Sequence, residues 1–487
     1  MTNKKLIKDI SASTTQVILN HVLGAAVFII TSRYLDKSVY GELNWSLAIL
    51  TFIITLLSLR LEQVVVRRVA SGDDPSKMLT IFSAHIFFSG ILFYLFLLAG
   101  SFLFPSFFRE HNLLLILAIS QLLSFFSLSY KQLAAGKEKF AWLAVMSSSA
   151  NIMRAVLLAG VLILSVLDIR RVLVIYTISS FIEFLLCIYL VQNRMGIRIN
   201  FRYTIRDYSM LLQESLPQIG VVFLNACIAR VDWILLGIFS TQVITAEYSF
   251  AYKLFELSPL PVLIIAPILL TRFSRYFSNH TQNELAEKKH ELSLLIRSEM
   301  ILATLLPLIL NVVWVPLIDG LTQNKYGAVN KTTFLVLSFC IPLQYLINLF
   351  WTIHFSLNHL ALILRVTAVT CTVIVVGDLF MIPLMNAQGA ALVYLAAMII
   401  EYLFYARYSV FAGSQKSFLP LVACVAVAFL SGFSVDKMEI SLMLKLLLSV
   451  TMYFVLLIIT RQVKKEDIGL VRQFIFNRNA HIEAANK

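Results

Sequence analysis

The sequence predicts an all-α integral membrane protein with about fourteen transmembrane helices and little mass outside the bilayer. Hydrophobic residues make up 59% of the 487 residues, charged residues make up only 14%, and the mean hydropathy is +0.83. Soluble domains carry about 25% charged residues, so a water-soluble fold could not bury this much apolar surface. The apolar segments are long and do not alternate with polar residues, which favours helices over the strands of a membrane barrel.

The positions of the helices follow from the length of each apolar segment, because a membrane span needs about twenty residues. Lys4, Lys5 and Lys8 precede a first segment that is too long for the core of a cleavable signal peptide, so we expect this span to be retained. The expected spans are 13–34, 40–59, 79–103, 112–133, 141–166, 171–191, 214–238, 247–270, 296–318, 332–356, 360–383, 387–408, 418–434 and 441–460.

The distribution of basic residues predicts the orientation of these spans. If the N-terminus lies in the cytoplasm, the segments on that side carry most of the 40 lysines and arginines, as basic cytoplasmic loops require. Both termini are therefore expected in the cytoplasm. The formal charge of +13 is spread over all the inner segments, so it does not indicate a nucleic-acid partner.

The five cysteines all fall inside apolar segments and form no CxxC pair. We interpret them as small buried hydrophobic residues, and we expect no metal site and no organic cofactor. They are Cys187, Cys227, Cys340, Cys371 and Cys424.

A basic cytoplasmic linker is expected at 193–213, between the sixth and seventh spans, with Arg194, Arg198, Arg202 and Arg206. These arginines are typical of anchoring against anionic lipid, and recognition of a cytoplasmic phosphate group is the alternative.

A weak internal repeat relates the two halves of the chain. Ser46-Leu47-Ala48 after the first span junction matches Ser249-Phe250-Ala251 after the seventh, about 203 residues later. Two bundles of six spans would have the same orientation, and such parallel halves are typical of transporters. We expect an N-terminal lobe at 1–192, a C-terminal lobe at 214–411, two additional spans within 412–460 and a basic cytoplasmic tail at 461–487.

Two stretches resemble a known family. They are SRYLDKSVYGELNWSLAIL with the following LRLEQVVVRRVAS, and the segment from Leu211 to Leu257, which contains Ser215-Leu216-Pro217 and Asp232 before an apolar run with Gly237. Both are similar to polysaccharide exporters, the Wzx-type O-antigen and capsule flippases of the multidrug/oligosaccharidyl-lipid/polysaccharide superfamily. One departure is Ala246-Glu247, where the family usually has a glycine before span eight.

This resemblance implies two six-helix lobes arranged as a V around a central cavity. It implies a flippase in the bacterial inner membrane that moves an undecaprenyl-diphosphate-linked oligosaccharide, such as an O-antigen, lipopolysaccharide, capsule or exopolysaccharide unit, to the outer leaflet. A polymerase and a chain-length regulator of the same glycan pathway are the protein partners that it suggests.

Charged residues inside the membrane are candidate functional groups, because each costs at least ~2.5–3.5 kcal/mol at a helix centre. An anionic diphosphate-sugar cargo needs charge compensation and hydrogen-bond donors, which arginine supplies. The best candidates are Arg154 and Arg230, at similar depths. The alternative is a structural ion pair of Arg154 with Glu183 or of Arg230 with Asp232, although the second two are about 200° apart on a helix. The further basic candidates are Lys253, which can instead pair with Glu256 three residues on, and Arg60 and Arg365 near span ends.

Four acidic residues are candidates for coupling transport to H⁺ or Na⁺, and no spacing selects among them: Asp232, Glu183, Asp378 and Glu401. Prolines in spans eight and nine predict bent helices that would serve as hinges during alternating access, or that are simply tolerated in membrane helices. The hinge candidates are Pro259, Pro261, Pro267 and Pro307.

Three other function classes remain open. A drug or small-cation extruder of the same superfamily is expected to line its cavity with acidic and aromatic residues, whereas the deep charges here include arginines. A membrane enzyme of glycan assembly needs a sizeable outer loop, and the longest outer loop, at 319–331, is too short for a catalytic domain. A structural scaffold does not account for the repeat or the buried charges.

Overall fold

The computed structural model describes residues 3–164, 167–200, 204–261, 289–408 and 417–462, and every regular element in these ranges is a helix. Twelve of the described helices are long and apolar enough to cross a membrane. The longest, α16 (Leu360–Tyr408), contains two of the expected spans, separated at Asn386, whose φ is 51°. The helix α10 (Gln242–Leu257) covers the first part of the expected span 247–270. With α16 counted as two helices and α10 added, the prediction of fourteen helices in an all-α membrane protein is confirmed.

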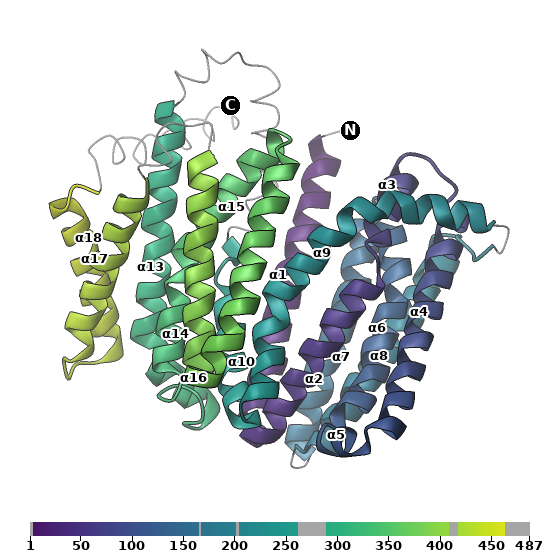
Figure 1. Cartoon of the computed structure of the whole chain (residues 1–487), viewed down its shortest axis with the longest axis horizontal. Coiled ribbons are helices and arrows are strands. Elements are labelled where there is room, and N and C mark those ends of the chain that lie inside the picture. Colours follow the sequence, from purple (N-terminus) through teal and green to yellow (C-terminus); the bar gives the residue numbers. More distant parts are fainter. Residues whose placement is uncertain (1–2, 165–166, 201–203, 262–288, 409–416, 463–487) are drawn as a thin grey trace, which may run out of the picture. The chain divides into compact units, whose positions relative to one another are not determined.

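The chain packs into two compact units (Figure 1). Unit 1 comprises Met1–Phe250, Leu321–Lys325 and Ile374–Ala390, and unit 2 comprises Ala251–Gly320, Tyr326–Val373 and Ala391–Lys487. These units group residues by packing, whereas the expected lobes group them by sequence repeat, so the lobe boundaries stay a prediction.

Unit 1 holds the first nine α-helices and one short π-helix. These are α1 (Asn3–Tyr34), α2 (Lys37–Leu57), α3 (Leu61–Ala70), α4 (Pro75–Leu103), α5 (Pro105–Glu110), α6 (Leu113–Gly136), α7 (Phe140–Leu164), α8 (Ile169–Tyr189), η1 (Leu190–Arg194) and α9 (Ile205–Phe239). The expected linker at 193–213 is therefore the end of η1, an irregular stretch and the first turns of α9. Arg202 lies outside the described residues.

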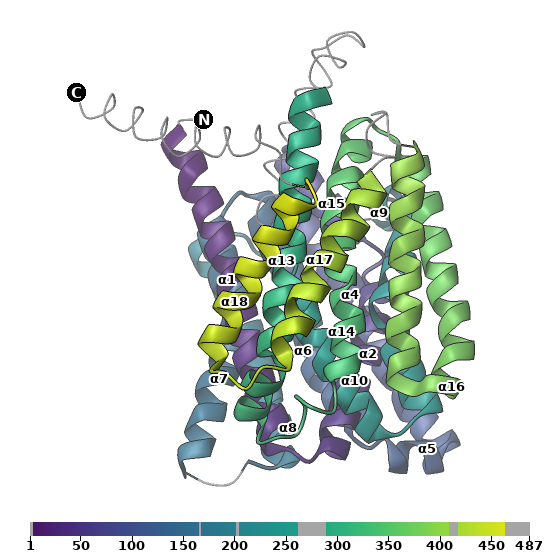
Figure 2. The same ribbon diagram turned by 90° about the vertical axis from the view of Figure 1, so that its left-hand side faces the viewer.

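Unit 2 contains α13 (Lys289–Thr322), α14 (Lys331–Ser338), α15 (Cys340–Ser356), α17 (Phe418–Asp436) and α18 (Leu442–Ile459), with the outer parts of α16. The last two helices lie beside α13 (Figure 2). Leu308 of α13 packs with Val427 of α17 and Tyr453 of α18, and the Tyr453 hydroxyl lies 2.6 Å from the Thr304 hydroxyl. The two additional C-terminal helices, α17 and α18, thus pack against α13 within unit 2.

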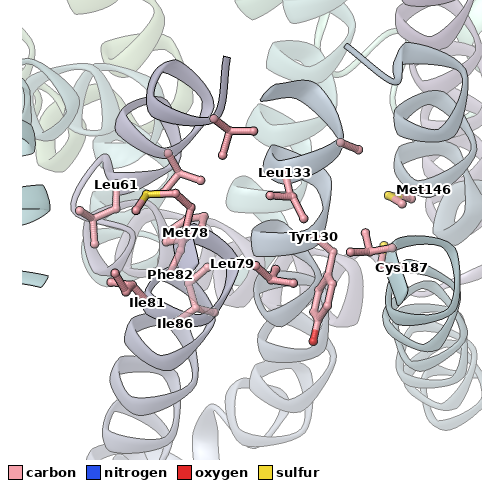
Figure 3. Close-up of a cluster of buried hydrophobic side chains, with 14 of the residues drawn as sticks. Leu61, Met78, Leu79, Ile81, Phe82, Ile86, Tyr130, Leu133, Met146 and Cys187 are labelled. Atoms are coloured by element: carbon pink, nitrogen blue, oxygen red, sulfur yellow. The ribbon is translucent and has the colours of Figure 1, made fainter. Parts of the chain in front are cut away.

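The short helix α3 is folded onto unit 1 by a sharp break after α2. Leu59 and Arg60 both adopt left-handed φ values, 48° and 60°, which end α2 and redirect the chain. Leu61, Val64 and Val69 are then buried in a core cluster that includes residues of α4, α6 and α8 (Figure 3). Burial of these side chains on one face holds α3 in place and turns its polar face outward.

A tight contact joins α2 to the segment that ends α9 and begins α10, at the end of unit 1 opposite α3. A Cβ atom at Gly41 would lie 1.8 Å from the carbonyl oxygen of Gln242, and one at Gly237 would lie 1.9 Å from the Trp45 ring. Trp45 also donates a hydrogen bond to the carbonyl of Ile234 at 3.1 Å. We call this contact the glycine seam, because only glycine allows the helices to approach so closely.

The prolines have different local effects. α10 ends at Leu257, just before Pro259 and Pro261, as a helix-breaking role predicts. α13 instead continues through Pro307, whose carbonyl accepts a hydrogen bond from the Asn311 amide at 2.8 Å. Pro267 lies outside the described residues. Whether any of these prolines is a hinge stays a prediction.

Candidate functional site

A chain of polar side chains crosses the interior of unit 1 from α7 to α6 and α8. Arg154 of α7 donates a hydrogen bond to the Ser180 hydroxyl at 2.9 Å and lies over the Tyr176 ring, 4.6 Å from its centroid. Ser124 of α6 bonds both the Ser180 hydroxyl and the Glu183 carboxylate, at 3.1 and 3.0 Å. A path of hydroxyl groups thus connects the guanidinium of Arg154 with the carboxylate of Glu183.

Glu183 itself forms an ion pair with Lys131 of α6, and its side chain is only 4% exposed. The alternative of a direct Arg154–Glu183 ion pair is therefore wrong in this structure, because a nearer lysine neutralises the carboxylate. Within the described part of the chain, Arg154 has no carboxylate partner, and its Nε atom is buried without an acceptor. The guanidinium is half-buried and keeps donor capacity for a further ligand.

A second polar group lies where α9, α10 and α16 meet in unit 1. Asp232 is 1% exposed and accepts hydrogen bonds from the Tyr248 hydroxyl at 2.6 Å and from the backbone N–H of Trp233 at 2.8 Å. Asp378 of α16 is also 1% exposed, lies within electrostatic range of Asp232, and has two carboxylate oxygens without a hydrogen-bond donor. Two buried carboxylates, of which Asp378 has both oxygens without a donor, form an arrangement that a proton or a small cation would stabilise.

The other basic candidates are distributed along the chain. The guanidinium of Arg230 lies over the Trp233 ring, 5.2 Å from its centroid. Lys253 pairs with Glu256 at 2.7 Å, as the spacing of three residues predicts. Arg60 lies at the break between α2 and α3 and pairs with Glu62 at 3.5 Å. Arg365 is exposed near the start of α16, where a long side chain can reach the interface.

Glu401 belongs to unit 2, whereas the other three acidic candidates belong to unit 1. Glu401 lies in electrostatic range of Tyr405, which is fully buried, and the nearby Thr370 hydroxyl donates its hydrogen bond to the Val366 carbonyl at 3.0 Å. Glu299 of α13 was not among the acidic candidates predicted from the sequence, and its Oε2 atom is buried without a partner. Lys131 was also missed, although its place inside an apolar segment was the signal that could have identified it.

Tyr248 and the hydroxyls of Ser124 and Ser180 could not have been found from sequence spacing. They come from different helices and meet only through packing. In the part of the chain that the structure describes, no three histidine, cysteine or carboxylate side chains gather as a metal site. All five cysteines are buried, and they form no disulfide with one another.

Comparison with solved structures identifies the fold. The lipid II flippase MurJ in an inward closed conformation matches with a TM-score of 0.71 and 14% identity, covering 92% of this chain and 98% of MurJ. An inward-facing multidrug resistance MATE family transporter of the MOP superfamily matches with a TM-score of 0.64 and 12% identity, covering 82% of this chain and 96% of the transporter. A MOP superfamily transporter from Pyrococcus furiosus, described as having a binding pocket of reverse polarity, matches with a TM-score of 0.55 and 12% identity, covering 86% of this chain and 96% of that one. The chain therefore has the fold of the MurJ and MATE transporters.

Comparison with protein families gives a match to the family described as "Polysaccharide biosynthesis protein" over residues 6–277, which is more than half of the chain. No curated protein matches the sequence. The matched region contains most of α1, all of α2 to α10 and the polar chain from Arg154 to Glu183. It also contains Asp232 and Tyr248, whereas Asp378 lies outside it. The predicted resemblance is confirmed, and this multi-pass membrane protein belongs to the polysaccharide biosynthesis protein family.

Proposed function

We propose that this protein is a flippase that carries an undecaprenyl-diphosphate-linked oligosaccharide from the inner to the outer leaflet of a bacterial cytoplasmic membrane. The family membership supports a role in polysaccharide synthesis, and the fold is shared with a lipid II flippase. In this role both termini lie in the cytoplasm, and the translocated unit passes to a polymerase and a chain-length regulator.

The observation that carries the proposal is the state of Arg154. Its positive charge is held inside a membrane unit by a hydroxyl and an aromatic face, without a neutralising carboxylate in the described residues. Such a charge is costly in a membrane, so a residue that keeps it there is a candidate functional group. A diphosphate group would provide the missing negative charge and accept hydrogen bonds from the remaining guanidinium donors.

The coupling ion is proposed to bind at Asp232 and Asp378, with Tyr248 as the neighbouring donor. Of the four acidic candidates, Glu183 is neutralised by Lys131, whereas both carboxylate oxygens of Asp378 are buried without a hydrogen-bond donor. A proton or Na⁺ would relieve the repulsion between the buried carboxylates of Asp378 and Asp232.

The flippase role is tested by deleting the gene and measuring lipid-linked oligosaccharide on each leaflet. Deletion is expected to trap the oligosaccharide on the cytoplasmic leaflet and to remove the surface glycan. Arg154→Ala is expected to fail to restore export at normal protein level, whereas Arg109→Ala, which changes an exposed arginine of α5, restores it. Unchanged surface glycan with a rise in drug sensitivity would instead establish the extruder.

The ion site is tested in proteoliposomes with an imposed gradient of H⁺ or of Na⁺. Asp378→Asn is expected to abolish the dependence of transport on one of these gradients, because it removes the unpartnered carboxylate. Glu401→Gln serves as the matched acidic variant in unit 2 and is expected to keep the dependence. Gradient-driven transport that is intact in Asp378→Asn and in Asp232→Asn refutes this assignment.

A further inference from the structure

A cavity of about 480 Å³ lies between α3, α6 and α9 in unit 1. Its volume is within the range of about 300–1,000 Å³ that is usual for small-molecule sites. Three glutamines, one arginine and three small apolar residues line it: Gln63, Val64, Val66, Arg67, Gln132, Ala135 and Gln218.

Each of the three helices contributes one glutamine to the cavity. Gln63 and Arg67 are four residues apart on α3, so both lie on one helix face. Gly136 lets α3 approach closely, because a Cβ atom there would lie 2.9 Å from the Cβ of Val69. The left-handed break at Leu59 sets the direction of α3, in which Gln63 and Arg67 line the cavity.

The third wall comes from α9, where Gln218 lies four residues after Glu214. Glu214 accepts hydrogen bonds from Arg67, at 2.5 Å, and from Arg68, and this contact ties α9 to α3. Hydrogen bonding to Glu214 raises the pKa of Arg68 above its usual value. Arg68 is also paired with Asp73 at 3.2 Å. Arg67, which lines the cavity, is thus compensated by Glu214.

The three glutamine carboxamides are the groups that remain available. None has a side-chain hydrogen-bond partner among the described residues of the protein. A carboxamide both donates and accepts, whereas a phosphate needs donors only and is repelled by the carbonyl oxygen. Hydroxyl and acetamido groups of a sugar both donate and accept, and Val66 and Ala135 offer apolar surface to the face of a sugar ring.

We propose that this cavity is an entry subsite for the sugar part of the cargo, in which Gln63, Gln132 and Gln218 bind hydroxyl or acetamido groups of a neutral sugar. The inference rests on the proposed flippase function and deepens it. α3, which lines the cavity, lies at the same end of unit 1 as the start of α1 (Figure 1). With the N-terminus in the cytoplasm, as proposed, this is the end where the cargo is loaded. The cavity is separate from Arg154, so the sugar and the diphosphate are bound by different groups.

The test uses the full chain in detergent micelles and two water-soluble probes, geranyl diphosphate and geranyl-diphosphate-linked N-acetylglucosamine. Isothermal titration calorimetry gives the affinity for each probe, and their ratio measures the contribution of the sugar. The wild-type protein is expected to bind the glycosylated probe about tenfold more tightly. Each of Gln63→Leu, Gln132→Leu and Gln218→Leu is expected to reduce this preference roughly three- to tenfold, as the loss of one or two hydrogen bonds implies.

Gln213→Leu is the matched control, because Gln213 is an exposed glutamine of the same helix α9 outside the cavity. It is expected to keep the full preference, and all four variants are expected to bind geranyl diphosphate like the wild type. Equal affinity of the wild type for both probes, or equal effects of Gln213→Leu and Gln218→Leu, overturns the sugar subsite while the flippase role stands. If neither probe binds and deletion traps no lipid-linked oligosaccharide, the flippase function and the subsite both fall.

Discussion

Replacing Gly41 with alanine is expected to open the glycine seam between α2 and α10. The added Cβ would lie 1.8 Å from the carbonyl oxygen of Gln242 and 2.7 Å from its carbonyl carbon. Both are backbone atoms, so no side-chain rotation can make room, and the helices must move apart. Gly237→Ala tests the same contact independently, because its Cβ would overlap the Trp45 ring.

The size of the effect follows from the cost of overpacking. Forcing one extra carbon into a packed contact costs about 1–3 kcal/mol. If the seam opens in another conformation of the transport cycle, this cost falls on the closed conformation only, and the equilibrium shifts by roughly 5- to 150-fold. Lys37→Gln removes the partly exposed ion pair with Glu247 at 2.6 Å, and its shift is expected to be smaller because such pairs contribute little.

A single reporter cysteine measures this shift. Thr245 is 1% exposed and lies one residue from Ala246, whose backbone nitrogen is 3.1 Å from the position of the added Cβ. Thr245→Cys is introduced after the five buried native cysteines have been replaced with alanine. Labelling by a membrane-impermeant maleimide in proteoliposomes is expected to be at least about fivefold faster when Gly41→Ala is added.

Gly220→Ala provides the matched control, since a Cβ at this glycine of α9 has nothing within 4 Å. It is expected to leave the labelling rate unchanged and to stabilise the helix slightly. Equal labelling rates in the Gly41→Ala and Gly220→Ala proteins, with equal amounts of folded protein, refute the role of the seam.

Three further predictions concern stability and pairing. The ring centroid of His111 lies 4.1 Å from that of Trp45, and burial lowers the pKa of this histidine. The unfolded chain therefore binds more protons below about pH 6.5, so stability is lost as the pH falls. The melting temperature is expected to drop between pH 7.5 and 5, and His111→Phe is expected to flatten this dependence. Gly136→Ala is expected to destabilise the protein by about 1–3 kcal/mol, because the added Cβ pushes α3 away from α6. Gly160→Ala is expected to leave the stability unchanged, because a Cβ at Gly160 has no atom within 4 Å. Equal denaturation midpoints of the two variants would contradict the close contact between α3 and α6. Lys253 is expected to serve mainly as the ion-pair partner of Glu256, so Lys253→Met impairs export by leaving this carboxylate unpaired, and adding Glu256→Gln restores export. An export defect that persists in the double variant assigns Lys253 to binding of the cargo instead.

Properties that depend on composition and on neighbours along the chain were predictable. The membrane class follows from the apolar content, and the helices follow from the length of each apolar segment. The break between the eleventh and twelfth expected spans coincides with Asn386, which has a left-handed φ. The Lys253–Glu256 pair follows from helix geometry, since residues three apart lie on one face.

Contacts between segments that are distant in the sequence could be known only from the tertiary structure. The sequence offered Arg154 as a partner for Glu183, but the fold places Lys131, from a third helix, against that carboxylate. Tyr248 meets Asp232, and three glutamines from three helices line one cavity, although nothing in their spacing relates them. The physical reason is that the rotation and depth of each helix in a membrane are set by close side-chain packing, and glycines such as Gly41 and Gly136 reveal their role only when the neighbouring helix is in place.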